Sequence, residues 1–181
     1  MLKITEFRKE NMEIAKKAMG KIIEEKKNVL IVGQAGCGKT QFLKSIIDNG
    51  QEHVLVLTEV QRGFGMYSEF REYPEMILFS DFDPKEVKDY VQKKNKKMLV
   101  ADDVYFRNGK NFTEKIINET RREMSVFVST QGNMKGQEDF KNPVIADVLK
   151  NFDYVVLFPN HMERMENPKL HSTLYETKRL V

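Results

Sequence analysis

VLIVGQAGCGKT, residues Val29–Thr40, is the most informative stretch of this chain. Its first four residues are apolar and mostly β-branched, which is typical of a buried strand. The next eight residues match the pattern G-x-x-x-x-G-K-[ST] of a phosphate-binding loop, the Walker A motif. The apolar positions of residues 41–47 then predict a helix, which Asn49 and Gly50 end. A strand, a glycine-rich loop and a helix in this order predict a nucleotide-binding site.

The residue types of this loop suit phosphate chemistry. Glycines let the backbone curl so that successive N–H groups point at phosphate oxygens, and the helix N-terminus adds partial positive charge. We expect Lys39 to reach the β- and γ-phosphates and the Thr40 hydroxyl to bind Mg²⁺. The alternative, a glycine-rich turn with an exposed lysine, leaves Thr40 and the preceding strand unexplained. The predicted nucleotide-binding residues are Gly33, Gln34, Ala35, Gly36, Cys37, Gly38, Lys39 and Thr40.

Length and composition favour a globular protein. The 181 residues suit one α/β domain, with 40% hydrophobic and 31% charged residues. We expect this single domain to comprise an N-terminal helix in 1–27, a core in 28–158 and a C-terminal tail in 159–181. No apolar run approaches a membrane span, and the N-terminus lacks the apolar stretch of a signal peptide. The single cysteine indicates a reducing compartment, so we expect a cytoplasmic protein, and the net charge of +3 permits contact with nucleic acid.

Strand and helix patterns alternate along the chain, which predicts a mostly parallel central sheet flanked by helices. The tail after the last strand fits either an edge strand or a short helix, and 76–79 fits a short strand or an edge. Strands are expected at 29–32, 53–58, 98–101, 125–129 and 154–158. Helices are expected at 5–27, 41–47, 84–94 with Asp83 as N-cap, 112–124, and between Pro143 and about 151.

A second motif follows the strand at 98–101, where two carboxylates, Asp102 and Asp103, come directly after apolar residues. This is the shape of a Walker B strand, and we expect it to lie next to the strand of the phosphate-binding loop. Asp102 would hold Mg²⁺, directly or through water, and Asp103 would act on the attacking water as general base or as the group that orients it. Taken alone, a pair of aspartates after a strand is also common as a helix cap or turn.

Gln131 ends the next predicted strand and supplies the third polar group at this edge of the sheet. A glutamine amide can donate to the γ-phosphate, or it can hold the attacking water while accepting from it. The carboxyl ends of parallel strands meet at one edge, where α/β proteins bind their ligands. We therefore expect all three motifs to form one site.

Together these motifs resemble those of the FtsK–HerA superfamily of P-loop ATPases, above all its small genome-packaging ATPases of poxvirus-like and internal-membrane viruses. The resemblance rests on GQAGCGKT (33–40), MLVADDV (98–104), VFVSTQ (126–131) and NPVIADVLKNFDYVVLF (142–158). It implies a RecA-like (ASCE) P-loop NTPase fold with ATP and Mg²⁺ as cofactors. It also implies ATP hydrolysis by a homo-oligomeric ring that translocates double-stranded DNA into a capsid. A capsid or membrane protein would recruit the ring, in the host cytoplasm or at the virion.

The resemblance also implies an arginine that acts on the neighbouring subunit's nucleotide. Arg121 and Arg122 lie in the matching region before the strand of Gln131. They fit a solvated helix face equally well. DNA contacts would come from the loops at 61–71, 107–111 and 132–142, which carry Arg62, Arg71, Arg107, Lys110, Lys135 and Lys141. Solvated loop charges without a DNA-binding role would give the same pattern.

Two other functions fit the same motifs. One is an AAA+ ATPase of the helicase-loader type, which would need an arginine-bearing lid after the last core strand. The other is a nucleotide-dependent switch, in which hydrolysis only resets a binding surface. A nucleotide kinase fits less well, because its arginines usually cluster in a lid and those of this chain are scattered.

Overall fold

The structure is a computed structural model of the whole chain. It describes residues 19–47, 54–58, 66–68, 74–78, 83–94, 96–104, 115, 118–120, 123–132, 148–159, 161–166 and 172–177. Within these ranges no helix is long and apolar enough to cross a bilayer.

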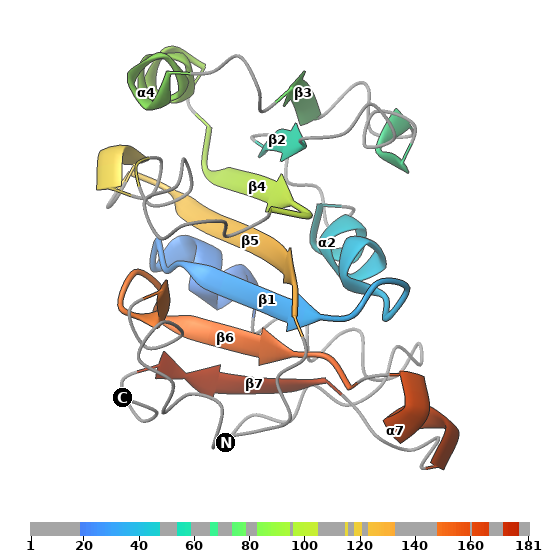
Figure 1. Ribbon diagram of the computed structural model, residues 1–181. Coiled ribbons are helices and arrows are strands. Elements are labelled where there is room, and N and C mark those ends of the chain that lie inside the picture. Colours follow the sequence, from blue (N-terminus) through green and yellow to red (C-terminus); the bar gives the residue numbers. More distant parts are fainter. Residues whose placement is uncertain are drawn as a thin grey trace.

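The described strands form one seven-stranded sheet in the order β3-β2-β4-β5-β1-β6-β7 (Figure 1). All neighbouring pairs are parallel except β6 and β7, which are antiparallel. This mostly parallel sheet is the one that the alternating sequence pattern predicts. The strands are β1 (Val29–Gly33), β2 (Val54–Thr58), β3 (Pro74–Leu78), β4 (Met98–Asp102), β5 (Ser125–Gln131), β6 (Tyr154–Leu157) and β7 (Thr173–Glu176).

The order of the strands corrects one expectation from the sequence. The strand of Asp102, β4, is not adjacent to β1, because β5 lies between them and pairs with both. Spacing along the chain does not reveal this, since any right-handed crossover can skip a strand position and leave room for a later one. In consequence β5 lies between the strand of the phosphate-binding loop and the strand of Asp102.

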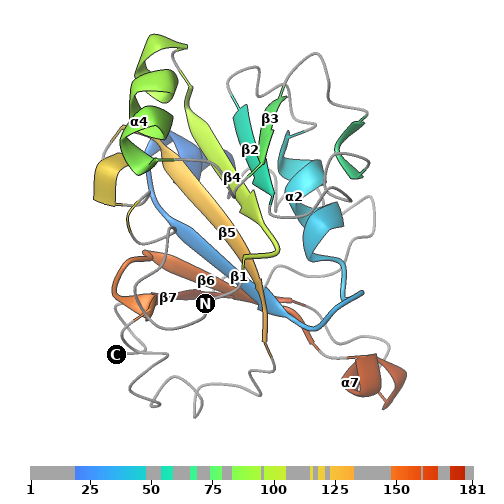
Figure 2. The ribbon, with the colours of Figure 1, turned by 45° about the horizontal axis from the view of Figure 1, so that its top comes forward.

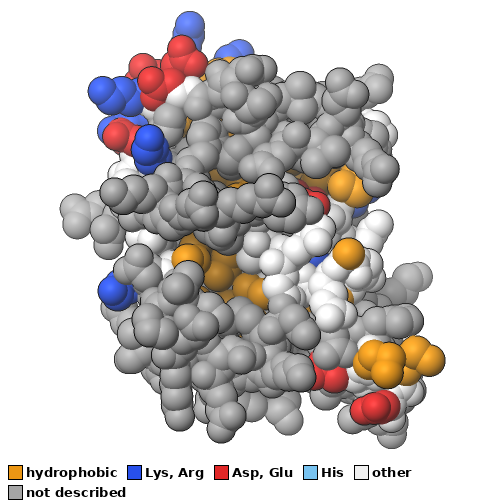
Figure 3. Space-filling model, in the orientation of Figure 1, with side chains coloured by type: hydrophobic (Ala, Val, Ile, Leu, Met, Phe, Trp, Pro, Cys, Tyr) orange, Lys and Arg blue, Asp and Glu red, His pale blue; other side chains and the backbone are white. Residues whose placement is uncertain are grey.

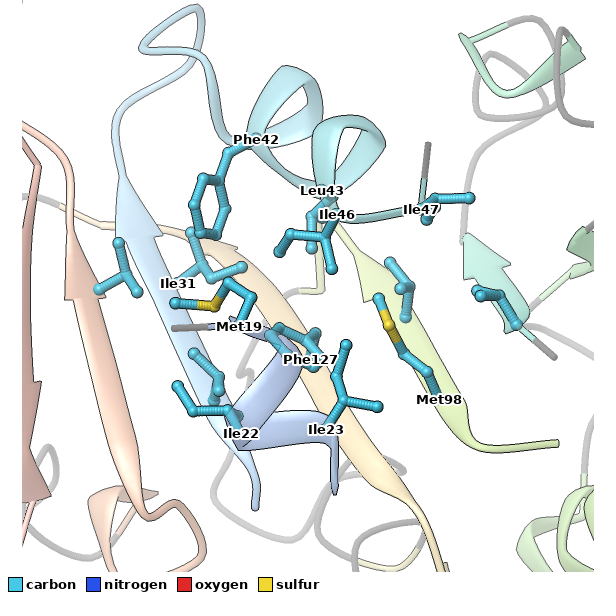
Figure 4. Packing of buried hydrophobic residues seen from close by; sticks show 14 of the residues in the cluster. Met19, Ile22, Ile23, Ile31, Phe42, Leu43, Ile46, Ile47, Met98 and Phe127 are labelled. Atoms are coloured by element: carbon cyan, nitrogen blue, oxygen red, sulfur yellow. The ribbon is translucent and has the colours of Figure 1, made fainter. Parts of the chain in front are cut away.

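Alternate side chains of the strands pack against helices on the two faces of the sheet. On one face, Ile31 and Phe127 contact residues of α2 (Lys39–Ile47) and of the helical residues 19–24 (Figure 4). On the other face, Leu30 and Val128 belong to a second cluster with Val87 of α4 (Pro84–Lys93). Both faces of a parallel sheet must be covered, which explains the unbroken apolar runs of β1 and β4. The three layers are visible in Figure 2.

The first helix ends earlier than the sequence pattern predicts. Residues 19–24 are helical, and the chain then turns with Lys26 in the left-handed region, at a φ of 53°. Lys27 N donates to Ile22 O at 3.0 Å and Lys26 N to Ile23 O at 3.1 Å, the bonding pattern of a Schellman cap. This cap stops the helix at 24, although Lys and Glu residues up to 27 favour continuation. Residues 5–18 of the predicted helix lie outside the described part.

Other helices follow the sequence to different extents. α4 begins at Pro84, and the Asp83 carboxylate caps it by accepting from Lys85 N at 2.9 Å, as predicted. Its outward side carries the mixed charges at the upper left of Figure 3. The predicted helix 112–124 is helical at 115 and 118–120, but Glu123 and Met124 are not helical. Glu123 N bonds to Thr120 O in a turn, which lets Met124 enter the core before β5 begins.

The tail takes both of the forms that its pattern allows. It forms a short helix, α7 (His161–Glu166), and then returns as β7 to pair with β6 at the edge of the sheet. At the opposite edge, β3 confirms the short strand expected near 76–79. Met162 and Met165 of α7 are exposed, at 66% and 68%, and form the hydrophobic patch at the lower right of Figure 3.

Candidate active site

The phosphate-binding loop joins β1 to α2 at the carboxyl edge of the sheet. Gly36 and Gly38 have φ angles of 75° and 103°, a conformation that side chains with a Cβ rarely adopt. Gly33 is required for another reason. A Cβ there would lie 2.5 Å from Cys37 Sγ and 2.8 Å from Phe158 Cβ. The loop is therefore folded tightly against the residue that follows β6.

Lys39 is buried within this loop, with 6% of its surface exposed. Its ammonium group donates to Gly33 O and to Gln34 O, each at 2.9 Å. α2 begins at Lys39, and Phe42 N donates to Gly38 O, so the amides of residues 39–41 belong to the first turn, whose N–H groups lack a partner within the helix. The loop thus presents one cation and a set of helix-terminal N–H groups, which suits an anion.

Asp102 lies at the end of β4 and is 1% exposed. Three hydroxyl groups donate to its carboxylate. Thr40 Oγ1 and Tyr67 Oη each donate to Oδ2 at 2.9 Å, and Ser129 Oγ donates to Oδ1. These bonds compensate the cost of burying a charge that has no cation beside it in the described part of the chain. The two expected metal ligands, Thr40 and Asp102, therefore meet across the width of β5.

Tyr67 stays protonated in this setting. It is fully buried, and burial raises the pKa of its phenol well above the usual value, with the charge of Asp102 raising it further. The phenol is therefore a donor to Asp102 throughout the neutral range.

Asp103 faces a different environment from its neighbour. It has a φ of 58°, in the left-handed region, and its backbone N–H donates to Ser129 Oγ at 2.8 Å. Gln131 Nε2 donates to both of its carboxylate oxygens, at 3.0 and 3.3 Å. Unlike Asp102, this pair lies at the exposed rim of the site. The structure thus brings Asp103 and Gln131 together.

The end of β5 holds this arrangement in place. Val104 N donates to Ser129 O at 2.8 Å, and Thr130 Oγ1 donates to Val104 O at 2.7 Å. On the other side, Gly33 pairs with Gln131 in the register of β1 and β5. The turn after β4 and the start of the phosphate-binding loop are therefore both fixed to the same strand.

The residues present fit a magnesium nucleotide. Hydroxyl and carboxylate oxygens are the hard donors that Mg²⁺ prefers, and this ion usually keeps waters and phosphate oxygens as its remaining ligands. Within the described residues no group of three or more His, Cys, Asp or Glu side chains could form a metal cage by itself. The donor set is therefore of the kind that completes its coordination with a phosphate ligand.

Two predicted parts of the site lie outside the described residues. They are Arg121 and Arg122, proposed to act on a neighbouring subunit, and the basic side chains of the three expected DNA-binding loops.

Sequence reasoning also missed two residues that the structure places on Asp102. Ser129 lies two positions before Gln131 and so shares its side of β5, which was a usable signal. Tyr67 lies in an irregular stretch that gave no such signal.

No protein-family model matches the chain, and no curated protein matches it in sequence. Solved structures do match its fold. The VirB11 ATPase of the Brucella suis type IV secretion system, solved in complex with sulphate, matches with a TM-score of 0.60 and 11% identity. The match covers 93% of this chain and 55% of that chain, so this chain spans about half of the VirB11 length.

Two further structures match with lower TM-scores. One is a separately solved ATPase domain, which matches with a TM-score of 0.51 and 11% identity, over 81% of this chain and 73% of that one. The other is a Pyrococcus horikoshii OT3 protein, Project ID PH0250, which matches with a TM-score of 0.52 and 11% identity, over 80% of this chain and 87% of that one. At such identities the likeness concerns the fold. The chain has the α/β fold of a RecA-like P-loop ATPase, as the sequence predicted.

Proposed function

We propose that this protein binds ATP with Mg²⁺ and hydrolyses it. The observation that carries this proposal is the meeting of two polar pairs beside the phosphate-binding loop. Thr40 bonds to Asp102 at 2.9 Å, and Gln131 bonds to Asp103 at 3.0 Å. A binding loop alone needs only the first pair, whereas the second pair supplies a base and an amide at the rim. The fold shared with the VirB11 ATPase and with a second solved ATPase domain is in keeping with this proposal.

Each side chain then has a defined task. Lys39 would exchange its bonds to Gly33 O and Gln34 O for bonds to phosphate oxygens. Asp103 would accept a proton from the water that attacks the γ-phosphorus, and Gln131 would orient that water. The bond between the γ-phosphorus and the bridging oxygen breaks, which releases ADP and phosphate. Thr40 and Asp102 would hold Mg²⁺, which when bound neutralises charge on the phosphates.

The test is ATP turnover by the purified chain, measured with Asp103→Asn beside the wild type. The asparagine keeps the shape of the side chain and tolerates the left-handed backbone of this position, but it cannot accept a proton from water. We expect turnover in the wild type and a stable ATP complex with little turnover in the variant. Equal turnover in the two proteins would contradict the role of Asp103.

We further propose that hydrolysis drives translocation of double-stranded DNA by a ring of these chains, as in viral genome packaging. This rests on the resemblance of four motifs to the packaging ATPases and on the net charge of +3. In this proposal the chain is a single ATPase domain that acts in the host cytoplasm or at the virion. Turnover measured with and without long double-stranded DNA tests it, and stimulation by DNA is the expected result.

A nucleotide-dependent switch is the second candidate, and one contact favours it. Both oxygens of Asp103 accept from Gln131 Nε2, so the amide covers one side of the carboxylate on which a base would receive the attacking water. If this bond persists with nucleotide bound, the protein holds ATP without hydrolysing it. The helicase-loader alternative has less support, because it needs an arginine-bearing lid after the last core strand. The described part of the tail forms α7 and the edge strand β7 instead (Figure 1).

A further inference from the structure

Tyr67 is a buried polar residue that the proposed hydrolysis does not use. Its side chain is 0% exposed, and its hydroxyl donates to Asp102 Oδ2 at 2.9 Å. The same oxygen accepts from Thr40 Oγ1, the expected metal-binding hydroxyl. Tyr67 and Thr40 thus bond to the same oxygen of the expected metal ligand Asp102.

The position of Tyr67 in the chain makes this contact informative. It belongs to residues 66–68, between β2 and β3, and to neither the phosphate-binding loop nor the strands at the centre of the sheet. Its ring belongs to the hydrophobic cluster that packs under α2, and Lys44 Nζ lies 5.9 Å from the ring centroid. Tyr67 therefore links α2, which begins in the binding loop, to the carboxylate on β4.

Packing alone does not account for a tyrosine at this place. A phenylalanine would fill the same apolar space without the cost of removing a hydroxyl from water. The hydroxyl instead forms a charge-assisted bond to a buried carboxylate, the stronger kind of hydrogen bond. Ser129 donates to Oδ1 and Tyr67 to Oδ2, so the carboxylate is held at both oxygens and would stay held if Thr40 Oγ1 bound a metal instead.

We propose that Tyr67 is a positioning residue of the magnesium site, which orients Asp102 and makes binding of Mg²⁺-nucleotide depend on the segment 66–68. The proposal rests on the proposed Mg²⁺-nucleotide site, and it assigns a role to a residue outside all of the recognised motifs. Partners of metal ligands commonly change metal affinity by about 10–100-fold when removed.

The chain offers a matched control. Among the described residues, the Tyr90 hydroxyl is the buried side-chain polar atom without a hydrogen-bond partner. Tyr90 lies on α4, against the opposite face of the sheet from Tyr67. Tyr67→Phe and Tyr90→Phe therefore each remove one phenol oxygen. The oxygen of Tyr67 is bonded to Asp102, whereas that of Tyr90 has no hydrogen-bond partner.

The experiment measures binding of a fluorescent ADP analogue in excess Mg²⁺ and in EDTA, so that no hydrolysis is involved. Mn²⁺ titrated into the ADP complex and followed by electron paramagnetic resonance gives the metal affinity directly. For Tyr67→Phe we expect the affinity for the ADP analogue in EDTA to be unchanged. We expect its Mn²⁺ affinity, and the Mg²⁺ enhancement, which is the factor by which Mg²⁺ raises the affinity for the analogue, each to be lower by about tenfold or more. Tyr90→Phe should match the wild type in both.

Two results would overturn the proposal. One is a Tyr67→Phe protein with the full Mg²⁺ enhancement of the wild type. The other is an equal loss of ADP affinity with and without metal, which would mean that Tyr67 only supports the fold. Thermal unfolding of both variants shows that they are folded under the conditions of the assay.

A measurement on the wild type avoids dependence on the variant. In this measurement all six tyrosines of the wild type are replaced by 3-fluorotyrosine, and the protein is followed by fluorine NMR. The resonance that is missing from the spectrum of the labelled Tyr67→Phe variant is that of Tyr67. That resonance should shift when Mg²⁺ is added to the ADP complex, and no shift would count against the proposal. If the wild type shows Mg²⁺-enhanced binding but no turnover, the hydrolysis proposal fails and that for Tyr67 stands. If it binds no Mg²⁺-nucleotide, both fail.

Discussion

Two adjacent carboxylates occupy different environments in this site. Asp102 is buried under three hydroxyl donors, whereas Asp103 lies at the rim with Gln131. Neighbouring residues of a regular strand point to opposite faces. The left-handed backbone of Asp103 ends the strand and lets both carboxylates reach the same side of β5, where Ser129 and Gln131 receive them. The sequence predicts two carboxylates here but not how the backbone directs them.

Exchanging each aspartate for asparagine separates their tasks. We expect Asp103→Asn to bind Mg²⁺-ATP normally and to hydrolyse it about 10²–10⁴-fold more slowly, since the attacking water loses its acceptor. Asp102→Asn should instead weaken the Mg²⁺ enhancement of nucleotide binding. Steady-state turnover and binding of an ATP analogue measure the two effects. If Asp102→Asn proves the milder change in turnover, the roles are reversed.

Removing the loop cation has a third signature. Lys39→Ala deletes the ammonium that bonds to Gly33 O and Gln34 O, and with it a charged donor for phosphate. We expect nucleotide affinity to fall by at least about tenfold, because a charge-assisted hydrogen bond contributes about 1.5–3 kcal/mol. Equilibrium binding of a fluorescent ATP analogue measures this. Lys93→Ala, an exposed lysine in the last turn of α4, is the control and should leave affinity unchanged.

At the scale of secondary structure, the strands could be predicted more reliably than the ends of the helices. An apolar β-branched run such as that of β1 marks a strand buried on both faces, and the structure confirms it. The end of the first helix is set instead by a cap at Lys26, a residue that gives no sequence signal for it. The position of β5 between β1 and β4 depends on the crossovers, so the sequence pattern alone did not provide it.

Two glycines, Gly20 and Gly33, should respond in opposite ways to alanine. Gly33→Ala places a Cβ against Cys37 and Phe158, so the loop must shift and both stability and nucleotide affinity should fall. Gly20 lies in the helix of residues 19–24, and a Cβ there meets nothing within 4 Å. Gly20→Ala should therefore raise stability by about 0.5–1 kcal/mol. Chemical denaturation measures both, and a neutral Gly33→Ala would mean that the loop has room to adapt.

For the whole molecule, all described site residues gather at the carboxyl edge of one sheet. This could be predicted, because parallel strands deliver their ends to the same edge. The contact of Tyr67 with Asp102 could not be predicted, since residues 66–68 belong to a connection whose sequence pattern indicates neither helix nor strand.

The proposed ring makes a prediction about mixtures of subunits. If Arg121 acts on the neighbouring subunit's nucleotide, Arg121→Ala should lower turnover by up to about 10³–10⁵-fold and leave nucleotide affinity nearly intact. Mixed with Asp103→Asn, it should form some interfaces with both halves intact and so recover activity that neither variant has alone. Arg122→Ala is the comparison for the adjacent position. A fully active dilute monomer, or no recovery on mixing, would contradict a shared site.

The central place of β1 also has a consequence for biosynthesis. The strand is translated before both of its partners, which are β5, at 125–131, and β6, at 154–157. Until those residues have been translated, the apolar segment VLIV has no strand to pair with. The nascent chain therefore exposes an aggregation-prone hydrophobic segment. Pairings between residues so distant in the chain also form slowly. Chaperones should therefore bind the nascent chain at this segment, and nucleotide can help the protein fold only after β6 has been translated.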